Sequence, residues 1–132
     1  MKLLADTGAL LALAMRHDQN HQRAREFLGE HPRDRFMLTD LIVAEFATRM
    51  RASAGVAKAA EAADSLLRSR RYEIVFIDLD LLRAATAQMK RFADKRLSLT
   101  DCASFELMER LRLDAAFSFD TDFRDCGFPM VP

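Results

Sequence analysis

Short apolar runs that alternate with segments of helical spacing are the feature that most constrains the fold of this chain. The runs typical of buried strands are KLLA, FMLT, YEIVFI and DAAFSF, and residues 128–132 could add an edge strand despite their two prolines. Strands separated by helices predict a parallel sheet with helices on both faces. In such a sheet the carboxyl ends of the strands and the first turns of the following helices share one edge, where ligands bind.

Capping signals bound the helices between these runs. Thr39 is a good N-cap for the segment LIVAEFATRMRASA, and Gly55 is placed to end it. Ser98 or Thr100 could cap a helix over residues 101–112. The remaining helices are expected over residues 9–17, 18–30, 56–71 and 78–93.

Length and composition indicate a single globular domain over residues 1–132. Half of the residues are hydrophobic and 30% are charged, no repeat or linker divides the chain, and no apolar run approaches a membrane span. The opening MKLLADTGALLALAMRHD could be mistaken for a secretion signal, but Asp6 interrupts its apolar stretch. Two cysteines do not make a disulfide framework, and Cys102 is expected to face the core as a free thiol. A cytoplasmic location is the default expectation.

Four acidic residues far apart in the chain are expected to converge at the ligand-binding edge. Asp6 and Asp120 each follow a predicted strand, and Asp101 lies in the first turn of its helix. Glu45 lies six residues past Thr39, about 9 Å along the helix axis, and its longer side chain can reach back. Because like charges disfavour one another, a close cluster of carboxylates usually exists to hold divalent cations.

Each of these acids also has a structural alternative. Asp6 could be a helix N-cap, and Asp101 could merely complement a helix dipole. Asp120 could be a turn residue, and Glu45 could be an exposed helical residue, although its segment is mostly apolar. Any one of these structural roles is easy to explain, but all four acids having only structural roles at one edge would require an accidental convergence.

Basic residues gather just ahead of the Asp101 segment, although the formal net charge of the chain is zero. Sixteen of the twenty Lys and Arg residues are Arg, which favours bidentate phosphate contacts. Between residues 83 and 96 there are five basic residues and one acidic residue. These charges could form a solvated helix face, or they could guide a phosphate backbone toward the acids. The candidate residues for such backbone contacts are Lys90, Arg91, Lys95 and Arg96.

Four segments together resemble a PIN-domain ribonuclease, specifically the VapC toxins of bacterial toxin–antitoxin pairs. DTGALLAL resembles the opening motif of the family, LTDLIVAEFA its Glu-bearing helix, LSLTDCASF the segment with its third acid, and AFSFDTDF its closing motif. The resemblance spans essentially the whole chain, in family order. It implies a PIN-like three-layer α/β/α fold with a central parallel sheet of four to five strands.

The resemblance also implies roles for individual residues. The acids that it makes both catalytic and metal-binding are Asp6, Glu45, Asp101 and Asp120. Asp122 follows the same strand as Asp120 and is expected to be an auxiliary metal-binding acid. Thr7 and Thr100 resemble the supporting hydroxyls of the family, placed to orient a carboxylate or bind metal-bound water.

The implied function is that of a metal-dependent endoribonuclease, the toxin of a type II toxin–antitoxin system. One or two Mg²⁺ or Mn²⁺ ions would activate a water for attack on an RNA phosphodiester, and a cognate antitoxin protein would occupy the groove. Relatives commonly form homodimers, for which the apolar faces of residues 41–66 could serve, unless they simply cover the sheet. Two alternatives stay open: a PIN-type nuclease in RNA processing or on DNA without a toxin role, and a non-catalytic RNA-binding or interaction module.

Overall fold

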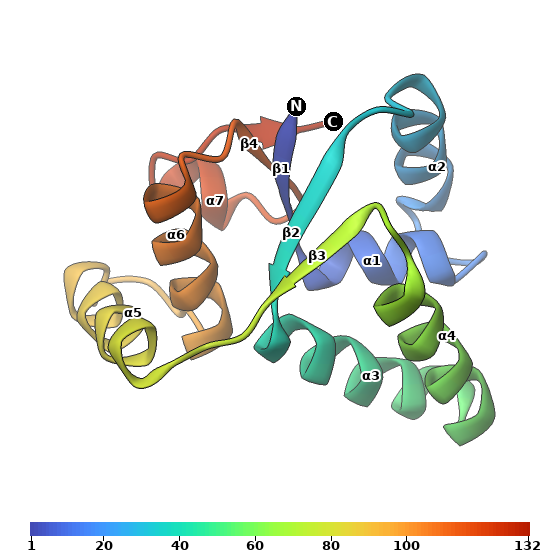
Figure 1. Ribbon diagram of the computed structural model, residues 1–132, viewed down its shortest axis with the longest axis horizontal. Helices are drawn as coiled ribbons and strands as arrows, with labels where there is room; N and C mark the ends of the chain where they lie inside the picture. The colour runs from blue at the N-terminus through green and yellow to red at the C-terminus, as the bar shows by residue number, and fades with distance from the viewer.

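A five-stranded parallel sheet runs through the centre of the computed structural model, which describes residues 1–132. Its strands are β1 (Lys2–Ala5), β2 (Arg35–Thr39), β3 (Tyr72–Val75), β4 (Ala115–Phe117) and β5 (Met130–Val131). They lie in the order β3-β2-β1-β4-β5, and every neighbouring pair is parallel. The predicted parallel sheet and its C-terminal edge strand are confirmed, with β1 in the middle (Figure 1).

Seven helices cover the two faces of this sheet. They are α1 (Thr7–Ala14), α2 (His21–Glu30), α3 (Asp40–Ala54), α4 (Val56–Arg68), α5 (Leu79–Arg91), α6 (Leu99–Leu111) and α7 (Asp122–Asp125). Successive strand residues point to opposite faces. Leu3 and Phe117 therefore pack with α1 to α4, whereas Leu4 and Ala116 pack with α5 to α7. Figure 1 shows the two groups of helices on opposite sides of the sheet, and the predicted three-layer α/β/α fold is confirmed.

Side-chain caps fix the ends of the helices that approach the ligand-binding edge. Thr39 Oγ1 accepts a hydrogen bond from Ile42 N at the start of α3, and Gly55 ends that helix with a φ of 87°, which suits glycine. Of the two candidate caps for α6, Ser98 is the one that the helix uses.

Several helices stop short of their predicted bounds, and one short helix was not predicted. Helix α1 ends at Ala14 instead of residue 17, and α5 spans Leu79–Arg91 instead of residues 78–93. Residue Asp18 accepts a hydrogen bond from the backbone N–H two residues further on, so the chain turns there and α2 begins only at His21. The Ser69 side chain accepts a bond from Arg71 N and turns the chain from α4 into β3. The helix α7 is a single turn, too short to carry a periodic signal.

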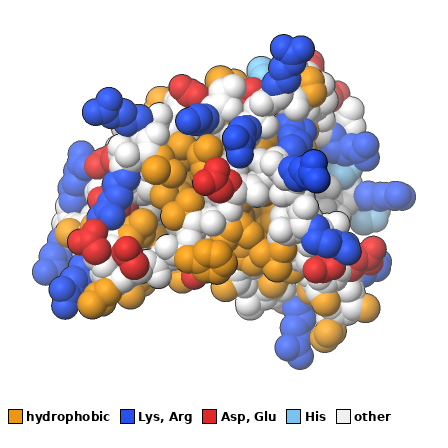
Figure 2. Space-filling model, in the orientation of Figure 1, with side chains coloured by type: hydrophobic (Ala, Val, Ile, Leu, Met, Phe, Trp, Pro, Cys, Tyr) orange, Lys and Arg blue, Asp and Glu red, His pale blue; other side chains and the backbone are white.

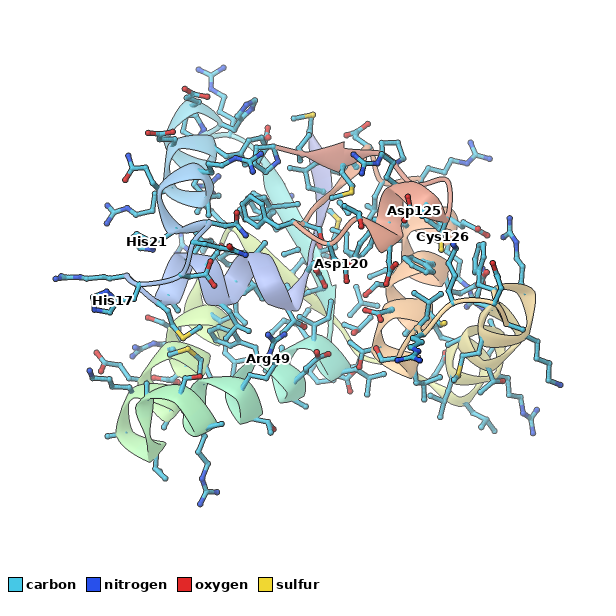
Figure 3. The ribbon with its side chains drawn as sticks, turned by 180° about the vertical axis from the view of Figure 1, so that it is seen from behind. His17, His21, Arg49, Asp120, Asp125 and Cys126 are labelled. Atoms are coloured by element: carbon cyan, nitrogen blue, oxygen red, sulfur yellow. The ribbon has the colours of Figure 1, made fainter.

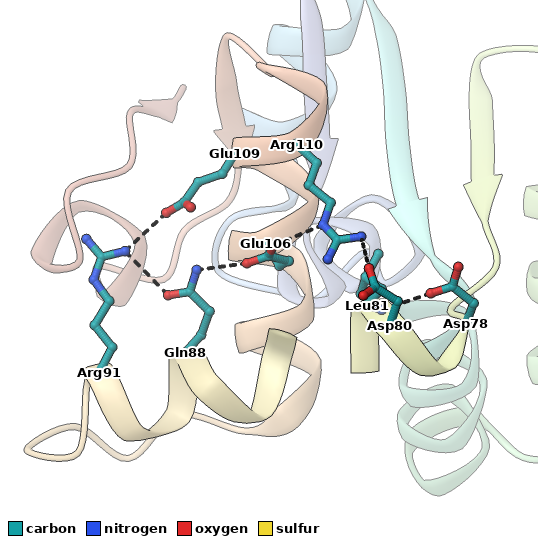
Figure 4. A network of polar contacts seen from close by, with 8 residues as sticks. All are labelled: Asp78, Asp80, Leu81, Gln88, Arg91, Glu106, Glu109 and Arg110. Carbon is teal, nitrogen blue, oxygen red and sulfur yellow. Dashed lines mark hydrogen bonds and ion pairs between the residues drawn. The ribbon is translucent and has the colours of Figure 1, made fainter. Parts of the chain in front are cut away.

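A polar network holds α5 against α6, the helix that carries Asp101 (Figure 4). Gln88, buried on α5, donates a 3.0 Å hydrogen bond to Glu106 Oε2. Arg110 pairs at 2.9 Å with both Glu106 and Asp80. Burial alone would raise the pKa of Glu106, but the hydrogen bonds from Arg110 and Gln88 and the charge of Arg110 lower it below its ordinary value. The network therefore fixes the helix that positions Asp101.

The apolar faces of residues 41–66, which could serve a second copy, are used in part within the chain. Ile42, Phe46 and other apolar side chains of α3 and α4 are buried against the sheet, whereas Val56 on α4 is 62% exposed. A second exposed apolar surface lies on the segment from β3 to α5, where Phe76 is 75% and Leu79 61% exposed and apolar side chains gather in Figure 2. A homodimer stays a prediction, and these two residues are candidates for its contact surface.

Cys102 faces the core as a free thiol, as predicted. Burial raises its pKa to about 11, so the thiol is neutral and packs as a small apolar group. None of the helices combines the length and the apolar character that crossing a membrane would require.

Candidate functional site

The four predicted acids line one open pocket of about 400 Å³ at the carboxyl edge of the sheet. Asp6 follows β1, Glu45 lies on α3, Asp101 lies on α6, and Asp120 lies between β4 and α7. The other lining residues are Thr7, Gly8, Leu11, Asp18, Asn20, Arg49, Arg96, Ser98 and Phe119. Figure 3 shows two of the lining residues, Arg49 on α3 and Asp120 on the loop before α7, beside the start of α1. Four elements that are distant in the sequence thus bring their acids to one pocket.

Asp6 is the most buried of the four acids, with 9% of its surface exposed. Ser118 Oγ donates a 2.8 Å hydrogen bond to Asp6 Oδ2. Burial raises the pKa of Asp6 to about 6; hydrogen bonds from Ser118 and the Thr7 backbone oppose that rise, and the charge of Asp101 adds to it. Although Asp6 occupies the N-cap position of α1, its side chain makes no capping hydrogen bond. Asp6 therefore stands at the N-cap position, as the structural alternative expected, but its carboxylate does not cap the helix and is free for another use.

Asp101 does serve the helix on which it lies. Its Oδ2 accepts a 2.9 Å hydrogen bond from Ser98 N, while Asp101 N donates a 3.0 Å bond to Ser98 Oγ. Together these bonds form a capping box at the start of α6. Asp101 therefore stabilises α6 and also lines the pocket of acids.

Asp120 forms a local turn at the edge of the same pocket. Its Oδ1 accepts a 2.9 Å hydrogen bond from Asp122 N, and its own N–H donates to Ser118 Oγ at 3.0 Å. The hydroxyl of Ser118 thus links the backbone of Asp120 to the side chain of Asp6. Asp122 does not line the pocket. Burial, together with nearby carboxylates such as Asp120, raises the pKa of Asp122 above its ordinary value.

Glu45 lies one helical turn before Arg49 on α3. Its Oε1 is 3.9 Å from Arg49 Nη1, and the two side chains are 35% and 56% exposed. An exposed pair of this spacing contributes little to stability. Glu45 is therefore neither buried nor strongly engaged, and its carboxylate is available to a ligand in the pocket.

The donor groups of the pocket fit a hard divalent cation, for which carboxylate and hydroxyl oxygens are suitable ligands. Glu45, Asp101 and Asp120 each engage one oxygen with a protein group, which leaves the other oxygen for a cation. The Thr7 hydroxyl is buried, lines the pocket and has no hydrogen-bond partner, as expected of a group that a ligand or a bound water satisfies. In the present arrangement no three acidic, histidine or cysteine groups lie close enough to hold one ion. A cation held here by one or two of these carboxylates would keep water molecules as its other ligands, as Mg²⁺ commonly does.

Two of the other predicted site residues line the pocket, namely Thr7 and Arg96. Thr100 does not; it lies in the first turn of α6, two residues after the cap Ser98, which does line the pocket. Lys95 is half-buried near Asp122, and its positive charge partly opposes the rise in the pKa of Asp122.

Arg91 and Lys90 lie in the last turn of α5, outside the pocket. Arg91 Nη1 is 3.2 Å from Glu109 Oε1, and its guanidinium lies 4.9 Å from the ring centroid of Phe92. Arg91 therefore belongs to the network that joins α5 to α6 (Figure 4). Lys90 is exposed and has no ion pair.

Several pocket-related residues were not predicted as site residues, and the three with side chains of most consequence for the site are Ser118, Arg49 and Phe119. A polar residue inside the apolar run AAFSF was a signal for Ser118. Arg49 follows Glu45 at the spacing of four that places side chains on one helix face. Phe119, with the guanidinium of Arg23 5.3 Å from its ring centroid, carried no signal beyond its position before Asp120.

The sequence matches the PIN domain family over residues 3–129. This chain belongs to that family. Within it, the 23S rRNA-specific endonuclease VapC20 of Mycobacterium tuberculosis is 26% identical to this PIN domain over 129 residues, which cover 98% of this chain and 97% of the relative.

Solved structures show the same fold. The crystal structure of Mycobacterium tuberculosis VapC20, described as a Sarcin-Ricin loop cleaving toxin, matches this PIN domain with a TM-score of 0.88 and 25% identity, over 96% of this chain and 95% of that one. VapBC2 from Rickettsia felis, bound to a DNA fragment from its promoter, gives a TM-score of 0.72 with 11% identity, over 99% and 98% of the two chains. A toxin–antitoxin complex from Klebsiella pneumoniae gives 0.65 with 19% identity, over 98% and 96%.

Proposed function

We propose that this PIN domain is a metal-dependent endoribonuclease and the toxin of a VapBC-like, type II toxin–antitoxin pair. The observation that carries the proposal is the convergence of four acids from four elements on one pocket: Asp6, Glu45, Asp101 and Asp120. The Mycobacterium tuberculosis relative, which is similar along nearly the whole chain, is named as an endonuclease specific for 23S rRNA. That similarity supports RNA as the substrate class.

The four acids would hold Mg²⁺ or Mn²⁺, with Asp122 as an auxiliary acid close to Asp120. Such a cation lowers the pKa of a bound water and offsets charge on the scissile phosphate. Ser118 keeps Asp6 in place through its 2.8 Å hydrogen bond. The unpartnered hydroxyl of Thr7 is available to orient a carboxylate or a water at the same place.

Basic residues beside the pocket would bring the RNA backbone to these acids. Arg96 lines the pocket, and Lys95, the residue before it, is close enough to Asp122 for its charge to act on that carboxyl. Lys90 and Arg91 lie further away on α5, and Arg91 is already paired with a glutamate. Arg96 is therefore the strongest of the four candidates for a phosphate contact.

An antitoxin protein is the proposed inhibitor, since the similar structures include a toxin–antitoxin complex. An open groove of about 1250 Å³ between α1, α3 and α4 has apolar lining residues that include Leu10 and Phe46. Asp18 lines both this groove and the acid pocket, so the two adjoin at that residue. A segment that binds in the groove could thus place an Arg or Lys near Asp6 and Asp101, because a guanidinium pairs well with carboxylates.

Induced expression followed by mapping of RNA ends tests this function. The wild-type chain should produce discrete new RNA 5′ ends and arrest growth, whereas Asp6→Asn, expressed to the same level, should do neither. Co-expression of a cognate antitoxin should suppress both effects. Full expression of folded wild-type protein without new RNA ends would contradict the proposal, and breaks in DNA instead of RNA would favour the alternative substrate.

A further inference from the structure

Two arginines line the pocket of acids, Arg96 and Arg49. The Arg49 guanidinium is held there only by the contact of 3.9 Å with Glu45, and it makes no other ion pair or hydrogen bond. Figure 3 shows Arg49 on α3, with Asp120 on the loop before α7. Arg49 is thus a flexible, exposed cation at the mouth of a site that is otherwise acidic.

The net charge of the pocket indicates a role for Arg49 in binding an anion. The lining includes five carboxylates and two guanidiniums, so its net charge is minus three when all are ionised. One divalent cation would change that charge to minus one. An RNA phosphate is itself negative, and without Arg49 it would meet one more uncompensated carboxylate. Arg49 therefore favours the entry of a phosphate into a pocket whose acids repel it.

The pair between Glu45 and Arg49 is weak enough to be exchanged. It is exposed, long, and formed within one helix, and such pairs contribute little to stability. Glu45 is also one of the acids proposed to hold a cation, which competes with Arg49 for the same carboxylate. A guanidinium binds phosphate as readily as carboxylate through its planar fork of N–H groups.

We propose that Arg49 is a phosphate-binding residue of this site, held by Glu45 in the free protein and paired with an RNA phosphate once a divalent cation engages Glu45. This inference rests on the proposed nuclease function and adds a specific substrate contact to it. It has two separate consequences. Arg49 opposes cation binding when RNA is absent, and it makes one phosphate contact when RNA is bound.

Manganese binding without RNA tests the first consequence. Titration of Mn²⁺, followed by the electron paramagnetic resonance signal of the free ion, should show that Arg49→Ala binds Mn²⁺ about 3- to 10-fold more tightly than wild type, because a nearby positive charge is gone. Arg49→Lys keeps the charge and should stay near wild type. Arg51→Ala is the matched control, since Arg51 lies on the same helix, is exposed and does not line the pocket.

RNA binding in the presence of Mn²⁺ tests the second consequence. Fluorescence anisotropy is measured at several salt concentrations with a labelled single-stranded RNA that the wild-type chain is first shown not to cleave, so that every proposed cation ligand is kept. Arg49→Ala should weaken binding about tenfold, the usual effect of losing a charge-assisted hydrogen bond. It should also reduce the slope of log affinity against log salt by about 0.7, because one phosphate contact is lost. Arg51→Ala should leave the slope unchanged.

The inference is overturned if Arg49→Ala equals Arg51→Ala in Mn²⁺ affinity, or if it leaves the salt slope of RNA binding unchanged. A merely structural role for Arg49 would lower the melting temperature without moving either quantity. Failure of the wild-type protein to cleave RNA would contradict the proposed function instead. The two binding measurements would still decide what Arg49 does.

Discussion

The hydroxyl of Ser118 donates a 2.8 Å hydrogen bond to Asp6 Oδ2 and so joins the ends of the adjacent strands β1 and β4 across 112 residues of sequence. This bond holds the most buried acid of the pocket, where burial raises the pKa of its carboxyl to about 6. The fold thus carries a carboxylate in a place that disfavours its charge. Such a residue is expected where binding or chemistry, and not stability, requires the charge.

Asp6→Asn should therefore stabilise the metal-free protein at neutral pH. The Asp6 carboxyl ionises at about 6 in the folded chain and at 3.8 when unperturbed, so its contribution to the free energy of unfolding falls as pH rises between these values. The full shift corresponds to about 3 kcal/mol. Urea unfolding in EDTA should show little difference between Asp6→Asn and wild type at pH 4 and a difference approaching that value above pH 7.

Added Mn²⁺ should make wild type more stable than Asp6→Asn, the reverse of their order in EDTA. The wild-type melting temperature should rise with Mn²⁺ because the ion binds the folded state, whereas Asp6→Asn should gain less. Asp64→Asn, an exposed position on α4, is the control and should respond as wild type does. A variant Asp6→Asn that is clearly less stable than wild type in EDTA at pH 8 would show that the carboxylate is structural.

Asp101 should behave differently, because its carboxylate also completes the capping box of α6. Asp101→Ala removes the acceptor for Ser98 N and should lower the free energy of unfolding in EDTA by about 1 kcal/mol. Asp101→Asn retains an acceptor oxygen and should stay close to wild type. Asp101→Ala at least as stable as wild type in urea unfolding would mean that relief of repulsion from Asp6 offsets or outweighs the loss of the cap.

Local sequence patterns could predict most of this fold because each of the first four strands is a short apolar run followed by a helix. The two cores follow from alternation along strands, as Leu3 and Leu4 illustrate by packing on opposite faces. The ends of α2 and α4 could not be predicted in this way. They depend on single side-chain hydrogen bonds, from the backbone to Asp18 and to Ser69, that periodicity does not reveal.

The acids of the site could be predicted for the same topological reason, since strand ends and helix starts share one edge of a parallel sheet. The residues that surround these acids could not be predicted from the sequence. Ser118 reaches Asp6 only after β4 is placed beside β1, and Arg49 enters the pocket only because α3 crosses it. Conversely, Arg91 is basic and near in sequence to Asp101, but its contact with Glu109 became visible only in the packed helices.

Arg96 should matter more for RNA than Arg91 does. Arg96 lines the acid pocket, whereas Arg91 is paired with Glu109 and lies against Phe92. Arg96→Ala should raise the KM for RNA cleavage about tenfold through loss of a phosphate contact. Arg91→Ala should lower thermal stability and leave KM near the wild-type value. Equal effects of the two variants on KM would indicate a diffuse basic surface without a specific contact.

Self-association, if it occurs as predicted, should depend on the apolar segment between β3 and α5. Phe76→Glu places a charge on its most exposed aromatic residue and should convert a dimer to a monomer in light scattering coupled to size exclusion. Val56→Glu, at a comparably exposed apolar position on α4, is the matched control and should remain dimeric. A monomeric wild type, or a dimer that survives Phe76→Glu, would contradict this prediction.

The central claim is that RNA cleavage needs a divalent cation together with the four acids, and metal-dependent cleavage of total RNA tests it most directly. Wild type and the variants Asp6→Asn, Glu45→Gln, Asp101→Asn and Asp120→Asn are compared in Mg²⁺, in Mn²⁺ and in EDTA, with circular dichroism confirming that each variant is folded. Wild type is predicted to cleave RNA with either cation and not in EDTA, and every variant is predicted to leave the RNA intact. Undiminished cleavage in EDTA, or by any one of the folded variants, would contradict the account.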